Sequence, residues 1–167
     1  ESYAATHNFI HFYRNEHNLG WNKNFITAFQ RAKGDYIAIC DQDDIWYPTK
    51  IVNQLVAIGK GDLCFAYSYR DPEFTTHGND IGAPQANLES MLFTSNVAGH
   101  YMLVRTAFVK SIKEWPNASY DWWLCLCSHL RHTLVVKPMP LNWRRPHADS
   151  ASALMREEAT RGRGATT

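Results

Sequence analysis

The sequence predicts an α/β fold built around a parallel sheet, and three observations indicate it. Short apolar runs alternate with helical patterns along the chain. Residues 36–40 (YIAIC) form a continuous, partly β-branched run, as in a strand covered on both faces. Three carboxylates, Asp41, Asp43 and Asp44, follow at once. Unpaired carboxylates are too costly to stay inside a buried strand, so we expect them at its carboxyl end, where open α/β sheets bind ligands.

The first predicted unit is a strand, a helix and a second strand within residues 9–40. Residues 9–13 (FIHFY) predict the first strand, and residues 18–20 (NLG) are typical of a turn. Apolar residues at helical spacing in 25–32 predict the helix, which Gly34 is expected to end. The two strands should then be parallel, with a right-handed crossover between them.

A second helix and strand are predicted after the acidic segment. Pro48 suits the first turn of a helix, whose buried stripe is expected to be Ile51, Leu55 and Ile58. Residues 63–67 (LCFAY) predict the next strand. Residues 70–87 have no period and predict a long loop, which in a compact domain is usually functional or disordered.

The rest of the chain predicts two more helices and two or three strands. Residues 90–97 are apolar and fit either a helix or a strand. The predicted elements after them are a strand at 101–104, helices at 106–112 and 120–130, a strand at 133–136 and an extended segment at 141–147. From Asp149 the chain turns small, polar and charged, so we expect a domain at 1–150 and a flexible polar tail at 151–167.

The composition describes one ordinary globular domain. The chain has 167 residues, of which 45% are hydrophobic, and a formal charge of +1, so no electrostatic argument favours a nucleic acid or an anionic membrane surface as partner. No apolar run approaches the roughly 20 residues of a membrane span. The four cysteines show no metal or redox spacing, so we expect buried thiols in a reducing, cytoplasmic environment.

The acidic segment itself leaves two interpretations open. Three carboxylates within four residues repel one another unless a cation lies among them. Oxygen ligands on a loop suit magnesium or manganese, held by one or two carboxylates and completed by substrate phosphates. The alternative is a solvated acidic turn with Asp44 near a helix start, and these residues alone do not decide between the two.

Several separated segments together resemble the family 2 glycosyltransferases, in particular the bacterial rhamnosyltransferase-like members. On the donor side these are residues 18–25 (NLGWNKNF), 32–37 (AKGDYI) and 41–50 (DQDDIWYPTK). Residues 96–100 (NVAGH) and 120–124 (YDWWL) resemble the acceptor-side segments of that family, and 143–147 (WRRPH) resembles its closing Tyr-Arg-x-His element. The resemblance covers about residues 9–150.

The resemblance implies a GT-A fold, a Rossmann-like α/β domain with a nucleotide-sugar site at the carboxyl edge of its sheet. It implies inverting transfer of a sugar, rhamnose among the candidates, from a dTDP- or UDP-linked donor. The acceptor would be a hydroxyl of a glycan or lipid-linked glycan in cell-surface polysaccharide synthesis. A divalent ion, Mn²⁺ or Mg²⁺, would stabilise the departing diphosphate, and a carboxylate would take the acceptor proton.

The resemblance also implies roles for four residues that carry the chemistry. Asp41 would face the ribose side of the nucleotide, and Asp43 would bind the metal. His147 matches a histidine that closes the metal–diphosphate site from the C-terminal side. Asp121 matches the catalytic base; an ordinary acid in the first turn of a helix, where the dipole favours an anion, is the alternative from spacing alone.

Three further residues have predicted binding roles by the same resemblance. Lys23 would touch the donor diphosphate, with an exposed surface lysine as the alternative. His100 and Trp122 would lie on the acceptor side, and core packing is the alternative for the tryptophan.

The chain departs from the family at its start. Family members begin with a strand, a helix and a second strand ending in paired Asp, which hold the nucleotide base and ribose. The first segment here matches a later strand, so we expect a GT-A domain without that N-terminal β-α-β portion, either a fragment or a chain completed by a partner.

Two rival functions remain after the resemblance. The first is a non-catalytic nucleotide-sugar or glycan-binding remnant of such an enzyme. The presence of Asp41, Asp43, Asp121 and His147 argues against it, because a dead site has no physical need for all four. The second is a metal-dependent phosphohydrolase, for which the sequence offers no second water-activating cluster.

Overall fold

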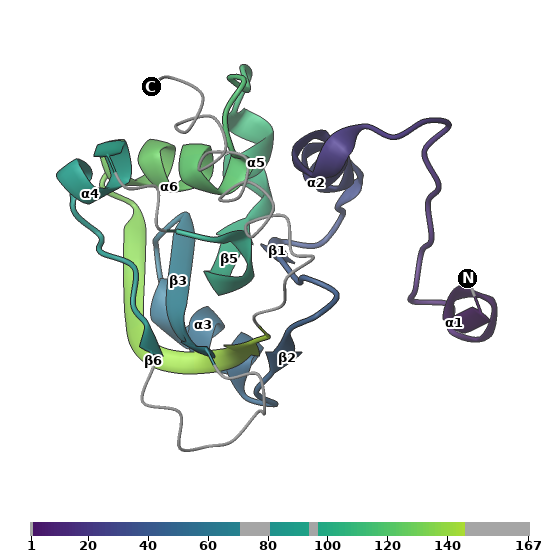
Figure 1. Cartoon of the computed structure of the whole chain (residues 1–167), viewed down its shortest axis with the longest axis horizontal. Helices are drawn as coiled ribbons and strands as arrows, with labels where there is room; N and C mark the ends of the chain where they lie inside the picture. The colour runs from purple at the N-terminus through teal and green to yellow at the C-terminus, as the bar shows by residue number, and fades with distance from the viewer. Residues whose placement is uncertain (1, 71–80, 94–96, 146–167) are drawn as a thin grey trace, which may run out of the picture.

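The computed structural model describes residues 2–70, 81–93 and 97–145, and a single curved sheet lies at their centre (Figure 1). Within these residues the strand order is β1-β5-β3-β6-β2, and β4 pairs with the far end of β3. The strands are β1 (Tyr36–Ala38), β2 (Ile45–Trp46), β3 (Leu63–Arg70), β4 (Ile81–Gly82), β5 (Met102–Arg105) and β6 (Leu134–Arg144).

The sheet is mixed. Strands β3 and β6 run parallel, and the other four pairings are antiparallel. The register of β3 against β6 shifts on both sides of Tyr67, and Figure 1 shows β6 bending strongly along its length. This bend brings the end of β6 to β2, immediately after the acidic segment.

Six α-helices and one 3₁₀ turn surround the sheet in the described residues. They are α1 (Ser2–Thr6), α2 (Gly20–Arg31), α3 (Lys50–Ile58), α4 (Leu88–Phe93), η1 (Gly99–Tyr101), α5 (Thr106–Ser111) and α6 (Tyr120–Leu130). Figure 1 shows α4, α6 and α5 in a row along one side of the sheet, with α1 away from it.

The two faces of the sheet are covered differently. Leu63 and Phe65 of β3 face the main core, where they cluster with Leu124 of α6 and Phe29 of α2. Alternate residues of a strand point to opposite faces. Cys64, between them, therefore lies on the face that α3 covers, and its carbonyl accepts a hydrogen bond from Gln54 of that helix.

Most of the elements predicted after residue 60 are confirmed, because each has a local apolar period. The predicted strand at 63–67 lies within β3, the helix at 120–130 is α6, and the helix at 106–112 contains α5. The ambiguous segment at 90–97 begins as the end of α4. The strand at 133–136 and the extended segment after 141 belong to one strand, β6. Residues 71–80 of the predicted loop and the predicted tail lie outside the described residues.

The strand–helix–strand unit predicted within residues 9–40 is wrong in its first strand and in its parallel pairing, whereas the predicted helix at 25–32 lies within α2 up to Arg31 and the second strand contains β1. Residues 9–13 form no strand, and Phe9 and Phe12 are exposed. Strand β1 comprises only Tyr36–Ala38 and pairs antiparallel with β5, as an end strand of the path rather than a central parallel one. Cys40 follows β1 and is exposed, so the prediction of four buried cysteines is also wrong. Apolar composition alone does not distinguish a buried strand from a half-buried end strand.

The buried stripe predicted for α3 is wrong at two of its three positions. Ile58 is 1% exposed as expected, but Leu55 is 39% exposed and Ile51 is only partly buried. The side chains that complete the buried face are Lys50 and Gln54, both fully buried.

His132, just after α6, has the backbone conformation that a glycine would adopt most easily. Its φ is +58°, in the left-handed region that costs an L-residue about 1–2 kcal/mol. We expect His132→Gly to raise the free energy of unfolding by about 0.5–1 kcal/mol, since the side chain is exposed. Urea denaturation measures this change in the free energy of unfolding. The matched control is His129→Gly, inside α6, which should lower stability by a similar amount; a loss of stability in both variants would contradict the prediction.

Candidate active site

The acidic segment leaves the carboxyl end of β1 and turns before β2. The backbone N–H of Asp44 donates to the carbonyl of Asp41 at 3.5 Å, which closes the turn. The turn places the Asp44 carboxylate inside the protein, with its side chain only 2% exposed, whereas that of Asp41 is 36% exposed. The predicted position of these acids after a strand is therefore confirmed, and one of them is deeply buried.

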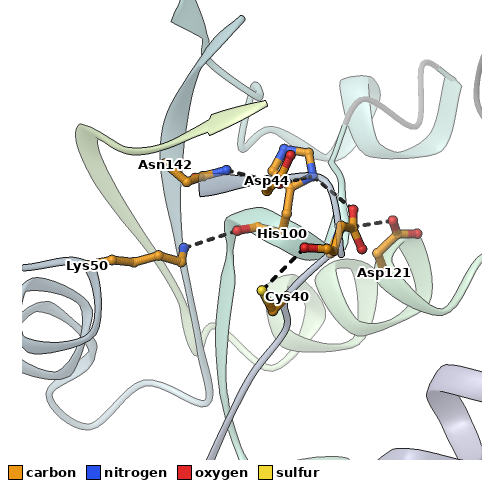
Figure 2. Close-up of polar contacts among 8 residues, drawn as sticks. Cys40, Asp44, Lys50, His100, Asp121 and Asn142 are labelled. Atoms are coloured by element: carbon orange, nitrogen blue, oxygen red, sulfur yellow. Dashed lines mark hydrogen bonds and ion pairs between the residues drawn. The ribbon is translucent and has the colours of Figure 1, made fainter. Parts of the chain in front are cut away.

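His100 of η1 lies against this turn. Its Nδ1 is 3.5 Å from Oδ2 of Asp41 and 3.7 Å from Oδ2 of Asp44. On the far side of Asp44, the side-chain amide of Asn142 donates to Oδ2 at 3.4 Å. Figure 2 shows Asn142, Asp44 and His100 in a row, with Asp121 on the other side of the imidazole. Segments far apart in the sequence thus meet at one point.

The charged form of the buried Asp44 carboxylate is electrostatically destabilised. The pKa of Asp44 is raised from its usual 3.8 to about 6, chiefly by burial and with contributions from the neighbouring Asp41 and Asp43, while His100 and Arg144 act in the opposite direction. A cation bound among these groups would relieve both the desolvation and the repulsion.

The donor atoms present fit a divalent cation. Ligand atoms of Asp41, Asp44 and His100 all lie within 4.8 Å of one another. The Nε2 of His100, which is itself 2% exposed, has no hydrogen-bond partner in the part of the chain that the structure describes. Two carboxylates and an imidazole suit manganese better than magnesium, since magnesium prefers oxygen ligands alone.

Asp121 lies in the first turn of α6, and its carboxylate accepts three hydrogen bonds. Its Oδ2 accepts the backbone N–H of Gly99 at 3.1 Å; its Oδ1 accepts the backbone N–H of Trp122 at 2.8 Å and the hydroxyl of Ser119. Burial nevertheless dominates and raises the pKa of Asp121 from 3.8 to about 6, against these hydrogen bonds and the nearby His100. A fixed carboxyl group that titrates near neutral pH is well suited to take a proton.

The turn η1 contacts both Asp121 and the acidic turn that contains Asp41 and Asp44. Gly99 donates its N–H to Asp121, and the next residue, His100, reaches Asp41 and Asp44. A Cβ at position 99 would collide with the hydroxyl of Tyr120 and crowd Ile39, so only glycine fits there without a shift of the Tyr120 ring. The asparagine side chain of Asn22 in α2 fixes the start of α6 by accepting the N–H of Tyr120 at 2.7 Å.

The structure describes three of the other four predicted site residues, Trp122, Lys23 and Asp43. Trp122 is half-buried and donates its Nε1–H to the carbonyl of Met91 in α4. Lys23 is exposed on α2, beside a hollow lined by Asn15, Asn18, Leu19, Gly20, Trp21 and Asn24. Asp43 is partly buried in the acidic turn but is not a member of the three-residue cluster. His147 lies outside the described residues. The roles of all four stay predictions.

Sequence reasoning missed Asp44 as a site residue. It expected a cation among the three carboxylates but named only Asp41 and Asp43 as donor-site residues; the alternative placed Asp44 near a helix start, but α3 begins six residues later at Lys50. The available signal was the third carboxylate directly after a strand. Sequence reasoning also missed Asn142, which gives no local signal because it contacts Asp44 across 98 residues of chain.

The fold and the site define an α/β domain with a carboxylate–imidazole cluster where the chain leaves β1, and the sequence comparison identifies its family. The pattern described as Glycosyl transferase family 2 matches residues 1–112, more than half of the chain, so the chain belongs to that family. The predicted family is confirmed.

Two curated relatives and two solved structures indicate what the chain is similar to. It is 34% identical over 134 residues to the Escherichia coli UDP-Glc:alpha-D-GlcNAc-diphosphoundecaprenol beta-1,3-glucosyltransferase WfaP, covering 75% of this chain and 51% of WfaP. It is 27% identical over 156 residues to the uncharacterized glycosyltransferase MJ1057 of Methanocaldococcus jannaschii, covering 84% and 52%. The chain therefore spans about half the length of these relatives.

The structural comparison supports the GT-A fold. S. aureus TarS residues 1–349, solved in complex with UDP-GlcNAc, superpose with a TM-score of 0.58 at 15% identity, over 78% of this chain and 40% of that one. A second TarS structure gives 0.55 at 16% identity, over 83% and 26%. The predicted α/β GT-A fold class is confirmed, but the sheet is mixed and not parallel as the sequence predicted. Among the described residues, none of the helices is long and apolar enough to cross a bilayer.

Proposed function

We propose that this chain contributes the catalytic centre of an inverting glycosyltransferase that moves a hexose from a nucleotide-diphosphate sugar to an acceptor hydroxyl. The observation that carries the proposal is the juxtaposition of a fixed carboxylate, Asp121, with a cation-binding cluster, joined through η1. Inverting transfer needs these two elements, a base for the acceptor hydroxyl and a positive charge for the departing diphosphate.

In this proposal Asp41, Asp44 and His100 hold a divalent cation. When bound, the cation supplies Lewis-acid stabilisation of diphosphate charge. The buried position of His100 against two carboxylates favours this role over the acceptor-side role predicted from the sequence. Asp43 and His147, predicted as metal ligands, remain candidates for completing the coordination.

Asp121 is proposed to accept the proton of the attacking hydroxyl. The N–H groups of Gly99 and Trp122 orient its carboxylate, and both also stabilise its charged form before the proton arrives. The half-buried Trp122, next to the base, offers an aromatic surface on which an acceptor sugar can pack. Lys23 is proposed to approach the donor diphosphate from α2.

The donor and acceptor classes follow from the relatives and are part of the proposal. WfaP is named for UDP-glucose as donor and a GlcNAc-diphosphoundecaprenol acceptor, and TarS was solved with UDP-GlcNAc. We therefore propose a UDP-hexose donor and a lipid-linked glycan acceptor, which would place the reaction at the cytoplasmic face of a membrane. Rhamnose from dTDP-rhamnose, indicated by the sequence resemblance, is the second donor to test.

The test is a transfer assay with the purified chain, Mn²⁺ and a synthetic GlcNAc-diphospholipid acceptor, analysed by mass spectrometry. UDP-glucose, UDP-GlcNAc and dTDP-rhamnose are compared. We expect a product heavier by one hexose, formed only when Mn²⁺ or Mg²⁺ is present. Nucleotide binding without any transfer would support the non-catalytic remnant instead. Release of free phosphate would support a hydrolase, and failure to bind nucleotide or cation would overturn the proposal.

A further inference from the structure

Helix α3 buries two polar side chains beside Ile58 and exposes two valines. Lys50 and Gln54 are 0% exposed, whereas Val52 and Val56 are 55% and 79% exposed. A helix that packs on a sheet normally shows the reverse pattern. Burying an ammonium group is costly: desolvation lowers the pKa of Lys50 from 10.5 to about 8. A methionine or leucine at the same positions would avoid that cost, so the two polar residues need a physical reason.

Both buried side chains bind main-chain carbonyls of η1. The Nζ of Lys50 donates to the carbonyl of His100 at 3.0 Å (Figure 2). It also lies 5.4 Å from the ring centre of Trp46. The Nε2 of Gln54, one helical turn further, donates to the carbonyl of Tyr101 at 2.8 Å and to that of Cys64 at 3.2 Å. One face of one helix therefore holds two consecutive carbonyls of a three-residue turn.

That turn carries both functional parts of the site. The N–H of Gly99 orients the carboxylate of Asp121, and the imidazole of His100 lies against the two carboxylates of the cation cluster. A rotation of the peptide after His100 would move the imidazole relative to Asp41 and Asp44. A 3₁₀ turn of three residues has few internal hydrogen bonds, so the hydrogen bonds from α3 help to hold the carbonyls of His100 and Tyr101 in place.

We infer that Lys50 and Gln54 are positioning residues, which clamp η1 so that His100 meets the acidic turn in cation-binding geometry. The inference rests on the proposed role of Asp41, Asp44 and His100 as a cation site. Residues that orient metal ligands from behind typically contribute a factor of about 10–100 to metal affinity. Lys50 should show an effect of this size, although it touches neither the cation nor the substrate.

The test measures Mn²⁺ dissociation constants by calorimetry for the wild type, Lys50→Met and Gln54→Met. Methionine keeps the length and most of the volume of both side chains and removes the donor. We expect Lys50→Met to bind Mn²⁺ about 10- to 100-fold more weakly, and Gln54→Met to change affinity in the same direction. A weaker affinity is informative, because removing the positive charge of Lys50 would by itself strengthen the binding of a nearby cation.

The matched control is Ile58→Ala, which truncates the third buried side chain on the same face of α3. This variant loses core packing and should melt at a lower temperature, but the folded protein should bind Mn²⁺ with wild-type affinity. Circular dichroism at the binding temperature confirms that each variant is folded. If Lys50→Met fails to fold, Gln54→Met carries the test alone.

The outcomes separate this inference from the function on which it rests. If the wild type binds no Mn²⁺, the proposed cation site fails. If the wild type binds and both methionine variants bind equally well or more tightly, only the positioning role fails. A loss of affinity in Ile58→Ala as large as that in Lys50→Met would also overturn it, because the effect would then reflect general loosening of α3.

Discussion

Replacing Asp121 by asparagine is expected to lower kcat about 10²- to 10⁴-fold while donor binding is retained. The substitution removes the basic oxygen but keeps the size of the side chain, and the start of α6 remains fixed by the hydrogen bond between Asn22 and the N–H of Tyr120. Transfer rates and UDP-sugar affinity are measured separately. A suitable control is Asp35→Asn, which changes an exposed acid by the same chemistry and should leave both quantities unchanged.

The pH dependence of kcat/KM in the wild type should reflect the protonation of Asp121. Burial raises the pKa of Asp121 to about 6, so the carboxyl group carries a proton below that pH and cannot act as a base. We therefore expect kcat/KM to fall as the pH decreases through about 6, two units above the usual range of an aspartic acid. A rate that is constant down to pH 5, or an Asp121→Asn variant with near wild-type kcat, would show that another group takes the proton.

Replacing Asp44 by asparagine is expected to weaken Mn²⁺ binding at least about 100-fold, because it removes the most buried carboxylate of the cation cluster. The asparagine oxygen can still accept the hydrogen bond from Asn142, so the turn should keep its shape. Asp43→Asn in the same turn is the matched control. A larger loss of affinity in Asp43→Asn than in Asp44→Asn would identify Asp43 as the principal ligand, as the sequence predicted.

The substitution Asp44→Asn should also stabilise the metal-free protein. The pKa of Asp44 is about 6 in the folded state, above its usual 3.8, so folding favours the protonated form and the charged form costs stability above pH 6. We expect Asp44→Asn to raise the free energy of unfolding by about 1–3 kcal/mol at pH 8 in the presence of EDTA. The gain should shrink as the pH falls through 6 and disappear below about 4. A destabilised variant at pH 8 would contradict this electrostatic account.

The amino-acid sequence was sufficient to predict the family, the class of fold and the elements that depend on local pattern. Helix α6 and strand β3 follow from apolar periodicity, and the acidic turn follows from the cost of leaving carboxylates inside a strand. Asp121 was placed at a helix start by its spacing alone. In each case the interactions that form the element join residues close together in the chain, so a local sequence pattern is enough to predict it.

The contacts between side chains from distant segments could be established only from the three-dimensional arrangement of the chain. The apolar run at 36–40 did not reveal that β1 pairs antiparallel with β5, because pairing depends on residues more than 60 positions away. Helical periodicity predicted the wrong buried stripe for α3, because hydrogen bonds to η1 outweigh the preference for burying apolar side chains. Asp44 meets His100 and Asn142 only through the bend of β6 and the clamp on η1. Such contacts depend on geometry between distant segments, which no local pattern specifies.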